Sequence, residues 1–112
     1  MRGFATCLFI LVTMSLAECA ERASEQESDR VIRASISCMA SAAEELDDHK
    51  SDAVSVAYGI LGRCSRELMD EYATAGKGFN FDNQQSIKRK LEVNNLKIAT
   101  EIVLKKRADR LK

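Results

Sequence analysis

"CMASAAEELDDHKSDAVSVAYGILGRC", residues 38–64, begins and ends with a cysteine and contains no proline. Its apolar residues recur at helical spacing on both sides of the polar stretch 46–52, which predicts two helices joined by a turn. Residue 51 is the midpoint of the segment and lies inside that turn. In an antiparallel hairpin the two cysteines therefore lie at nearly the same distance from the turn along the two helices. The sequence predicts a Cys38–Cys64 disulfide.

The first residues, "MRGFATCLFILVTMSLAECAE", have the layout of a secretory signal, with Arg2 followed by an apolar run and then small residues. The apolar run, about residues 4–16, is shorter than the roughly 20 residues that span a bilayer. We therefore expect a signal peptide over residues 1–17 and export to the periplasm or cell envelope. In such a compartment a disulfide persists.

The segment "LAEC", residues 16–19, resembles a bacterial lipobox, in which the cysteine becomes the lipidated first residue of the mature chain. Glu18 departs from that motif, because a small residue normally precedes the cysteine. Lipidation of Cys19 therefore stays open beside the alternative of a free thiol near the N-terminus.

The remaining chain has the length of one small domain. Proline is absent, and residues with good helix propensity are common. We expect a flexible N-terminal segment at 18–27 and a helical domain at 28–112. Helices are predicted at about 28–47, 52–75 and 84–110. The predicted fold is all-α, a small three-helix bundle built on a disulfide-pinned antiparallel helical hairpin.

Each predicted helix has a start signal and an apolar stripe. The expected N-caps are Ser28 or Asp29, Ser51 or Asp52, and Asp82 or Asn83. The first stripe comprises Ile32, Ile36, Met39, Ala43 and Leu46, flanked by Val31 and Cys38. The second comprises Ala53, Ala57, Ile60, Leu61, Cys64, Leu68 and Tyr72. The third comprises Ile87, Leu91, Ile98 and Ile102, with Leu96, Ala99 and Val103 widening the face. Gly76 and Gly78 are expected to end the second helix.

This arrangement resembles a loose class of small, functionally uncharacterised secreted two-cysteine helical envelope proteins of proteobacteria. The resemblance is carried by Cys38, Leu46, Asp47, Asp48, Ser51, Asp52, Ala53, Val56, Ala57 and Cys64. It implies an envelope location and a helical architecture, and it implies no activity.

The acidic turn, which contains the single histidine of the chain, is a candidate metal or catalytic site. The candidate ligands are Glu44, Glu45, Asp47, Asp48, His49 and Asp52. The turn lacks the glycine and terminal glutamate of a calcium loop, and one histidine does not make a typical zinc site. The chain also has no C-x-x-C, G-x-S-x-G or nucleotide-binding motif. We therefore expect a solvated acidic turn in a non-enzymatic protein, with no catalytic residue, metal or cofactor.

The formal net charge of zero conceals an asymmetry between the two parts of the chain. Residues 18–82 contain 14 acidic and 7 basic side chains, whereas residues 83–112 contain 3 acidic and 9 basic ones. The first interpretation is that the third helix packs on the hairpin and neutralises its acidic side chains.

The second interpretation concerns "LKKRADRLK", residues 104–112, which would overhang the bundle if the third helix is longer than the others. Its basic side chains would then contact an anionic membrane surface or an acidic partner. They are Lys105, Lys106, Arg107, Arg110 and Lys112. Nucleic acid is not an expected partner, because this basic stretch has no aromatic residues on which bases could stack.

Two functional hypotheses follow from these patterns. In the first, the protein is an interaction or structural module that binds an envelope protein through an exposed apolar strip, expected around Phe79 and Phe81. In the second, it associates with the membrane surface through residues 105–112, with a lipid on Cys19 as a possible second anchor. The identity of the partner and the oligomeric state are left open by the sequence.

Overall fold

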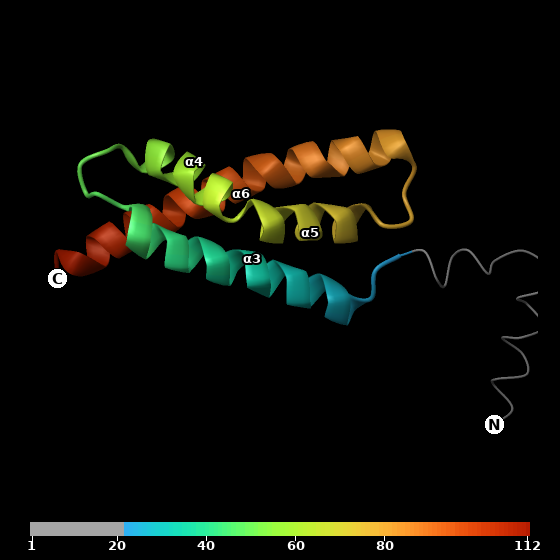
Figure 1. The fold of residues 1–112 in the computed structure, drawn as a ribbon, viewed down its shortest axis with the longest axis horizontal. Coiled ribbons are helices and arrows are strands. Elements are labelled where there is room, and N and C mark those ends of the chain that lie inside the picture. Colours follow the sequence, from blue (N-terminus) through green and yellow to red (C-terminus); the bar gives the residue numbers. More distant parts are fainter. Residues whose placement is uncertain (1–21) are drawn as a thin grey trace, which may run out of the picture.

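The structure is a computed structural model that describes residues 22–112, and this part of the chain forms four helices (Figure 1). The helices are α3 (Glu25–Leu46), α4 (Ala53–Arg63), α5 (Ser65–Gly76) and α6 (Phe81–Arg110). α3 runs in one direction, α4 and α5 return as one broken rod, and α6 runs back alongside them. The prediction of an all-α bundle is confirmed. The predicted signal peptide, residues 1–17, and Cys19 lie outside the described residues.

The predicted disulfide is present between Cys38 on α3 and Cys64 at the junction of α4 and α5. The S–S distance is 2.09 Å and the two Cα atoms are 5.9 Å apart. The sulfur of Cys64 lies in the core, where the residue is fully buried. The bond therefore joins the two arms of the helical hairpin, as the sequence predicts.

The second predicted helix, 52–75, is wrong as one continuous element. It is interrupted at Cys64, whose backbone dihedrals of φ −97° and ψ 19° are not those of an α-helix. α5 begins at the next residue without a side-chain cap. The bundle thus has three rods but four helices, because the middle rod bends at the disulfide.

Two of the predicted helix starts also differ from the structure. α3 begins at Glu25, where the Ser24 hydroxyl accepts a hydrogen bond of 3.1 Å from the backbone N–H of Glu27. This pairing of a serine with a glutamate three residues later is typical of a capping box. α6 begins after its N-cap Asn80, whose side-chain oxygen accepts a hydrogen bond of 2.9 Å from the backbone N–H of Asn83.

Other local signals in the sequence are confirmed. Asp52 is the N-cap of α4, and its carboxylate accepts hydrogen bonds from the N–H and the hydroxyl of Ser55. Gly78 adopts φ 84°, a left-handed conformation that glycine tolerates without strain. Gly76, in contrast, is the last residue of α5.

The buried face of α3 is rotated from the predicted stripe. Ile32 and Ile36 are 42% and 43% exposed, whereas Val31 and Ser35 are buried. The disulfide explains the rotation, because it turns the side of α3 that carries Cys38 toward α4 and α5. The buried residues on this side are the small Ser35, Ala42 and Ala43 together with Val31 and Met39.

The core is narrow and lies where α3, α4, α5 and α6 meet. Its fully or almost fully buried apolar residues are Met39, Ala42, Ala43, Val56, Ala57, Ile60, Cys64, Leu68, Ala99 and Val103. The predicted stripe of the middle rod is confirmed as buried or half-buried. On α6, Ile87, Leu91, Ile98 and Ile102 are only half-buried, because Asn95, Ala99 and Val103 form the centre of the contact face.

The described part of the chain is elongated, because α6 alone has 30 residues and is about 45 Å long. Its helices pack side by side as three rods, so each rod keeps a face that the other two do not cover (Figure 1).

Candidate functional site

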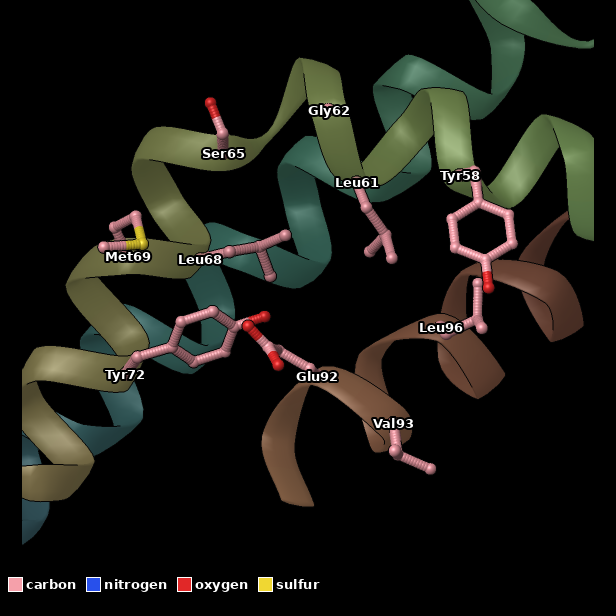
Figure 2. Close-up of a pocket in the computed structure, with 10 residues that line it drawn as sticks. All are labelled: Tyr58, Leu61, Gly62, Ser65, Leu68, Met69, Tyr72, Glu92, Val93 and Leu96. Carbon is pink, nitrogen blue, oxygen red and sulfur yellow. The ribbon is translucent and has the colours of Figure 1, made fainter. Parts of the chain in front are cut away.

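An apolar groove of about 510 Å³ lies between the broken middle rod and α6 (Figure 2). It is lined by Tyr58, Leu61, Gly62, Ser65, Leu68, Met69, Tyr72, Glu92, Val93 and Leu96. Tyr58 lies at one end beside Leu96, and Tyr72 lies at the other end beside Glu92. The groove is thus built from the two helices on either side of Cys64 and from the middle of α6.

The break at Cys64 places small residues along one wall of the groove. Gly62, in the last turn of α4, and Ser65, the first residue of α5, both line it. A Cβ atom added to Gly62 would meet no heavy atom within 4 Å, so the space in front of this residue is open. A bulky side chain from another molecule can enter this space without displacing the backbone.

The rim of the groove carries large apolar side chains that are exposed to solvent. The exposed fraction is 61% for Tyr58, 54% for Met69 and 73% for Val93. Single exposed apolar residues are ordinary on protein surfaces, but a cluster around a concave surface indicates a binding site. The groove is therefore the candidate functional site.

The groove has little charge of its own. Its lining contains one carboxylate, Glu92, whose Oε1 lies 3.9 Å from Nζ of Lys88 one helical turn away. Burial raises the pKa of the Tyr72 phenol above its ordinary value, and a hydrogen bond with Asn95 acts in the opposite direction. The Tyr72 phenol is therefore neutral at physiological pH. The surface is suited to apolar contacts.

The acidic turn between α3 and α4 forms a second cluster of polar side chains, and these side chains bond to other parts of the same bundle. The Asp47 carboxylate accepts hydrogen bonds from Nε and Nη2 of Arg107 on α6, the shortest of them 2.6 Å. The same Nη2 donates to the backbone carbonyl of Ser51 at 2.7 Å. These bonds fasten the C-terminal part of α6 to the turn.

The Arg107 guanidinium acts directly on the pKa of the Asp47 carboxyl. The Asp47 side chain is 4% exposed, and the Arg107 guanidinium lowers the pKa of its carboxyl from 3.8 to about 2 against the opposing effect of burial. The neighbouring Asp48 accepts bonds from the N–H and hydroxyl of Ser51, which hold its pKa below the usual range. Both carboxylates therefore stabilise the turn.

His49 lies on the outside of this turn in a left-handed conformation, with φ 60°. Its Nδ1 is 3.2 Å from Oδ2 of Asp47, and its Nε2 contacts the guanidinium of Arg110. Of the candidate metal ligands of the turn, Glu45 pairs with Arg63 on α4, and the others contact side chains of α6 or cap the backbone. Within residues 22–112, no three His, Cys, Asp or Glu side chains are grouped closely enough to hold a metal ion.

The basic residues near the C-terminus divide into two sets. Lys106 pairs with Glu44 at 2.7 Å, and Arg107 pairs with Asp47, so these two neutralise acidic side chains of α3 and the turn. Arg110 reaches His49. In the described part of the chain Lys105 and Lys112 have no ion pair. The expected overhang of α6 is reduced by these contacts with α3 and the turn, although residues 108–112 are exposed.

The phenylalanines at the other end of the bundle do not form a shared strip. Phe79 is half-buried, and the Arg22 guanidinium lies 5.0 Å from the centre of its ring in a cation–π contact. Phe81 is 71% exposed at the start of α6. Three of the large apolar side chains that are exposed between residues 22 and 112, Tyr58, Met69 and Val93, line the groove instead.

Sequence reasoning missed Tyr58, Met69 and Val93. For the first of these the sequence does contain a signal, because Val54, Tyr58 and Leu61 are spaced by four and three residues. This spacing makes a second apolar stripe on α4, beside the one that faces the core. Val93 carries no such signal.

Comparisons of the chain with protein-family models, curated proteins and solved structures give no match. None of the helices between residues 22 and 112 combines the length and the apolar character needed to cross a bilayer. The geometry of the groove is therefore the observation on which a functional proposal rests.

Proposed function

We propose that this protein is an exported, non-enzymatic interaction module of the bacterial cell envelope that binds a helical protein surface in the groove between α4–α5 and α6. The observation that carries the proposal is the concentration of exposed Tyr58, Met69 and Val93 around one apolar hollow. An exposed apolar patch around a hollow of this kind marks an interaction surface in soluble proteins.

Two observations support the envelope location. The N-terminal residues have the pattern of a secretory signal, and the Cys38–Cys64 disulfide suits an oxidising compartment. The disulfide also shapes the groove, because Cys64 is the residue at which the middle rod bends. Export and formation of the binding surface are thereby linked in the proposal.

The shape of the groove favours a helix as the bound element. Its two walls are helices, and its lining alternates large side chains with the small residues Gly62 and Ser65. Recognition of a helix in such a groove uses apolar anchors that recur every three to four residues. A loop or an extended strand would leave its own backbone polar groups unpaired in this apolar environment.

The membrane-surface hypothesis receives less support from the geometry. Lys106 and Arg107, two of the five basic side chains on which it depends, form ion pairs within the chain. The charge that is left for an anionic surface is accordingly smaller than the sequence predicts. The groove, in contrast, is an apolar surface without a partner in the described chain.

The proposal is tested by photo-crosslinking in the native host. The crosslinking residue p-benzoylphenylalanine replaces Tyr58 in the groove or, as the control, Phe81 outside it. Both native residues are aromatic and well exposed, at 61% and 71%, so neither replacement disturbs the core. We expect one adduct of defined mass from position 58 and none of that mass from position 81.

Specificity is established with Gly62→Leu combined with the crosslinker at position 58. The Cβ atom of the leucine meets no heavy atom within 4 Å, and its side chain projects into the hollow, so the adduct should decrease while the fold persists. An absence of adducts from position 58, or equal adducts from both positions, would refute the interaction module.

A further inference from the structure

We propose that the helical surface bound in the groove belongs to a second copy of this chain, so that the protein is a symmetric dimer joined through α4–α5 and α6. This inference rests on the proposed function, and it names the partner of the same site. It follows from the shape, the extent and the charge of the groove surface.

The groove surface carries both halves of an interlocking contact. The hollow in front of Gly62 and Ser65 is open, and the projecting side chains of Tyr58, Met69 and Val93 stand on the same surface. A twofold axis brings the same patch of two copies together, so that each copy contributes projections and receives them. A surface with both features fits a second copy of itself.

The extent of this surface is adequate for a stable dimer. Val54 and Tyr72 are 18 positions apart, which corresponds to about 27 Å along the middle rod. Together with α6 at its side the surface is about 20 Å wide, which gives a flat area of roughly 540 Å². Interlocking side chains raise the buried area toward the roughly 800 Å² per copy of a standard interface.

Further exposed apolar residues extend the same surface. Val54, at 45% exposed, precedes Tyr58 by one helical turn on α4. Leu104, at 52% exposed, follows Val93 by three turns on α6. The apolar character therefore continues beyond the groove along both helices.

The charge of the groove allows two identical copies to face each other. Its single carboxylate, Glu92, is accompanied by Lys88, so the lining is close to neutral. Within the groove lining, facing copies would accordingly not suffer the like-charge repulsion that opposes self-association of a charged patch, while Arg89 and Lys97, one turn to either side of Val93 on α6, lie outside this lining. A strongly acidic or basic partner, in contrast, would find no complementary charge there.

The test is sedimentation equilibrium of the purified protein, with its disulfide intact, at chain concentrations between about 1 and 200 μM. We expect a mass that rises with concentration to twice that of the chain. Val93→Glu places a charge on the surface of both copies and should raise the dimer dissociation constant at least about tenfold. Gly62→Leu should weaken the dimer in the same direction, because it fills the hollow.

The matched control is Phe81→Glu. Phe81 is 71% exposed and Val93 is 73% exposed, so the two variants introduce the same charge at equally accessible apolar positions. Only the Val93 variant should weaken the dimer. Circular dichroism and thermal melts of each variant show whether the fold is retained. The sedimentation of Gly62→Leu gives a second readout if Val93→Glu does not fold.

The inference is overturned if the wild-type chain stays monomeric over this concentration range. It is also overturned if Val93→Glu and Phe81→Glu have the same effect on the dimer. A monomeric protein that still gives a position-58 adduct of another mass in cells would disprove the dimer and leave the interaction module standing. A position-58 adduct of twice the chain mass would agree with both proposals.

Discussion

Arg107 holds Asp47 across a sequence separation of 60 residues, with hydrogen bonds from Nε and Nη2 to both carboxylate oxygens. The carboxylate is 4% exposed and the guanidinium side chain 25% exposed. Asp47 is also the C-cap of α3, and its side chain accepts a hydrogen bond of 3.0 Å from the backbone N–H of His49. One arginine thus joins α6 to the turn that defines the hairpin.

We expect Arg107→Ala to lower the melting temperature by about 5 to 10 °C, because it leaves the buried charge of Asp47 without its partner. Arg107→Lys should have an intermediate effect, since an ammonium group cannot form the forked pair of bonds. Lys105→Ala, which removes an exposed basic residue two positions away, is the control and should change the melting temperature by less than about 2 °C. Equal effects of the Arg107 and Lys105 alanine variants would contradict the role assigned to Arg107.

Stability should depend on pH through Asp47. Its pKa is about 2 in the folded protein and about 3.8 when unfolded, so the unfolded chain binds the proton more readily. The stabilisation from this carboxylate is complete above about pH 4 and is lost as the pH falls toward 2. Urea denaturation between pH 5 and pH 2 should therefore show a falling free energy of unfolding.

Asp47→Asn isolates this contribution, because an amide does not titrate in that range. The variant should be less stable at pH 5 and should lose less stability on acidification than the wild type. Some dependence on pH will remain, since the pKa of Glu44, Asp48 and Asp52 is also lowered in the fold. Parallel pH profiles for the variant and the wild type would show that Asp47 does not contribute.

The hairpin was predictable because its signals are local or symmetric in the sequence. Two cysteines equidistant from a polar turn specify both the disulfide and the antiparallel pairing, and Asp52 is a strong cap. The turn of Asp47 and Asp48 was recognised as polar, but its pairing with Arg107 was foreseen only as a general charge complementarity. No local pattern specifies which arginine would meet which aspartate.

The rest of the fold depends on tertiary geometry that periodicity does not contain. The disulfide rotates α3, so that Ser35 is buried and Ile36 is exposed, although residue type alone predicts the reverse. The break at Cys64 has no proline or glycine signal at that position. Because the groove arises from this break, its residues could not be assembled from the sequence.

Removal of the disulfide should destabilise the bundle and open the groove. The Cys38→Ala/Cys64→Ala variant loses a cross-link between residues 26 positions apart, which corresponds to about 3.5 kcal/mol of free energy of unfolding on the chain-entropy model. Urea denaturation of the variant, and of the wild type with and without reductant, measures this difference. Reductant should have no effect on the variant, and a variant as stable as the oxidised wild type would show that the bond is dispensable.

Alanine substitutions of three glycines should separate helix propensity from packing. A Cβ atom at Gly62 meets open space, and one at Gly59 lies 3.8 Å from Cδ1 of Leu46, an ordinary contact. Gly62→Ala and Gly59→Ala should therefore each raise the free energy of unfolding by about 0.5 to 1 kcal/mol. At the buried Gly76 the added atom lies 3.2 Å from Cγ of Gln84, so Gly76→Ala should give no such gain. Urea denaturation of the three variants measures their free energies of unfolding and so ranks them. A Gly62→Ala variant less stable than the wild type would mean that the space in front of α4 is already filled in solution.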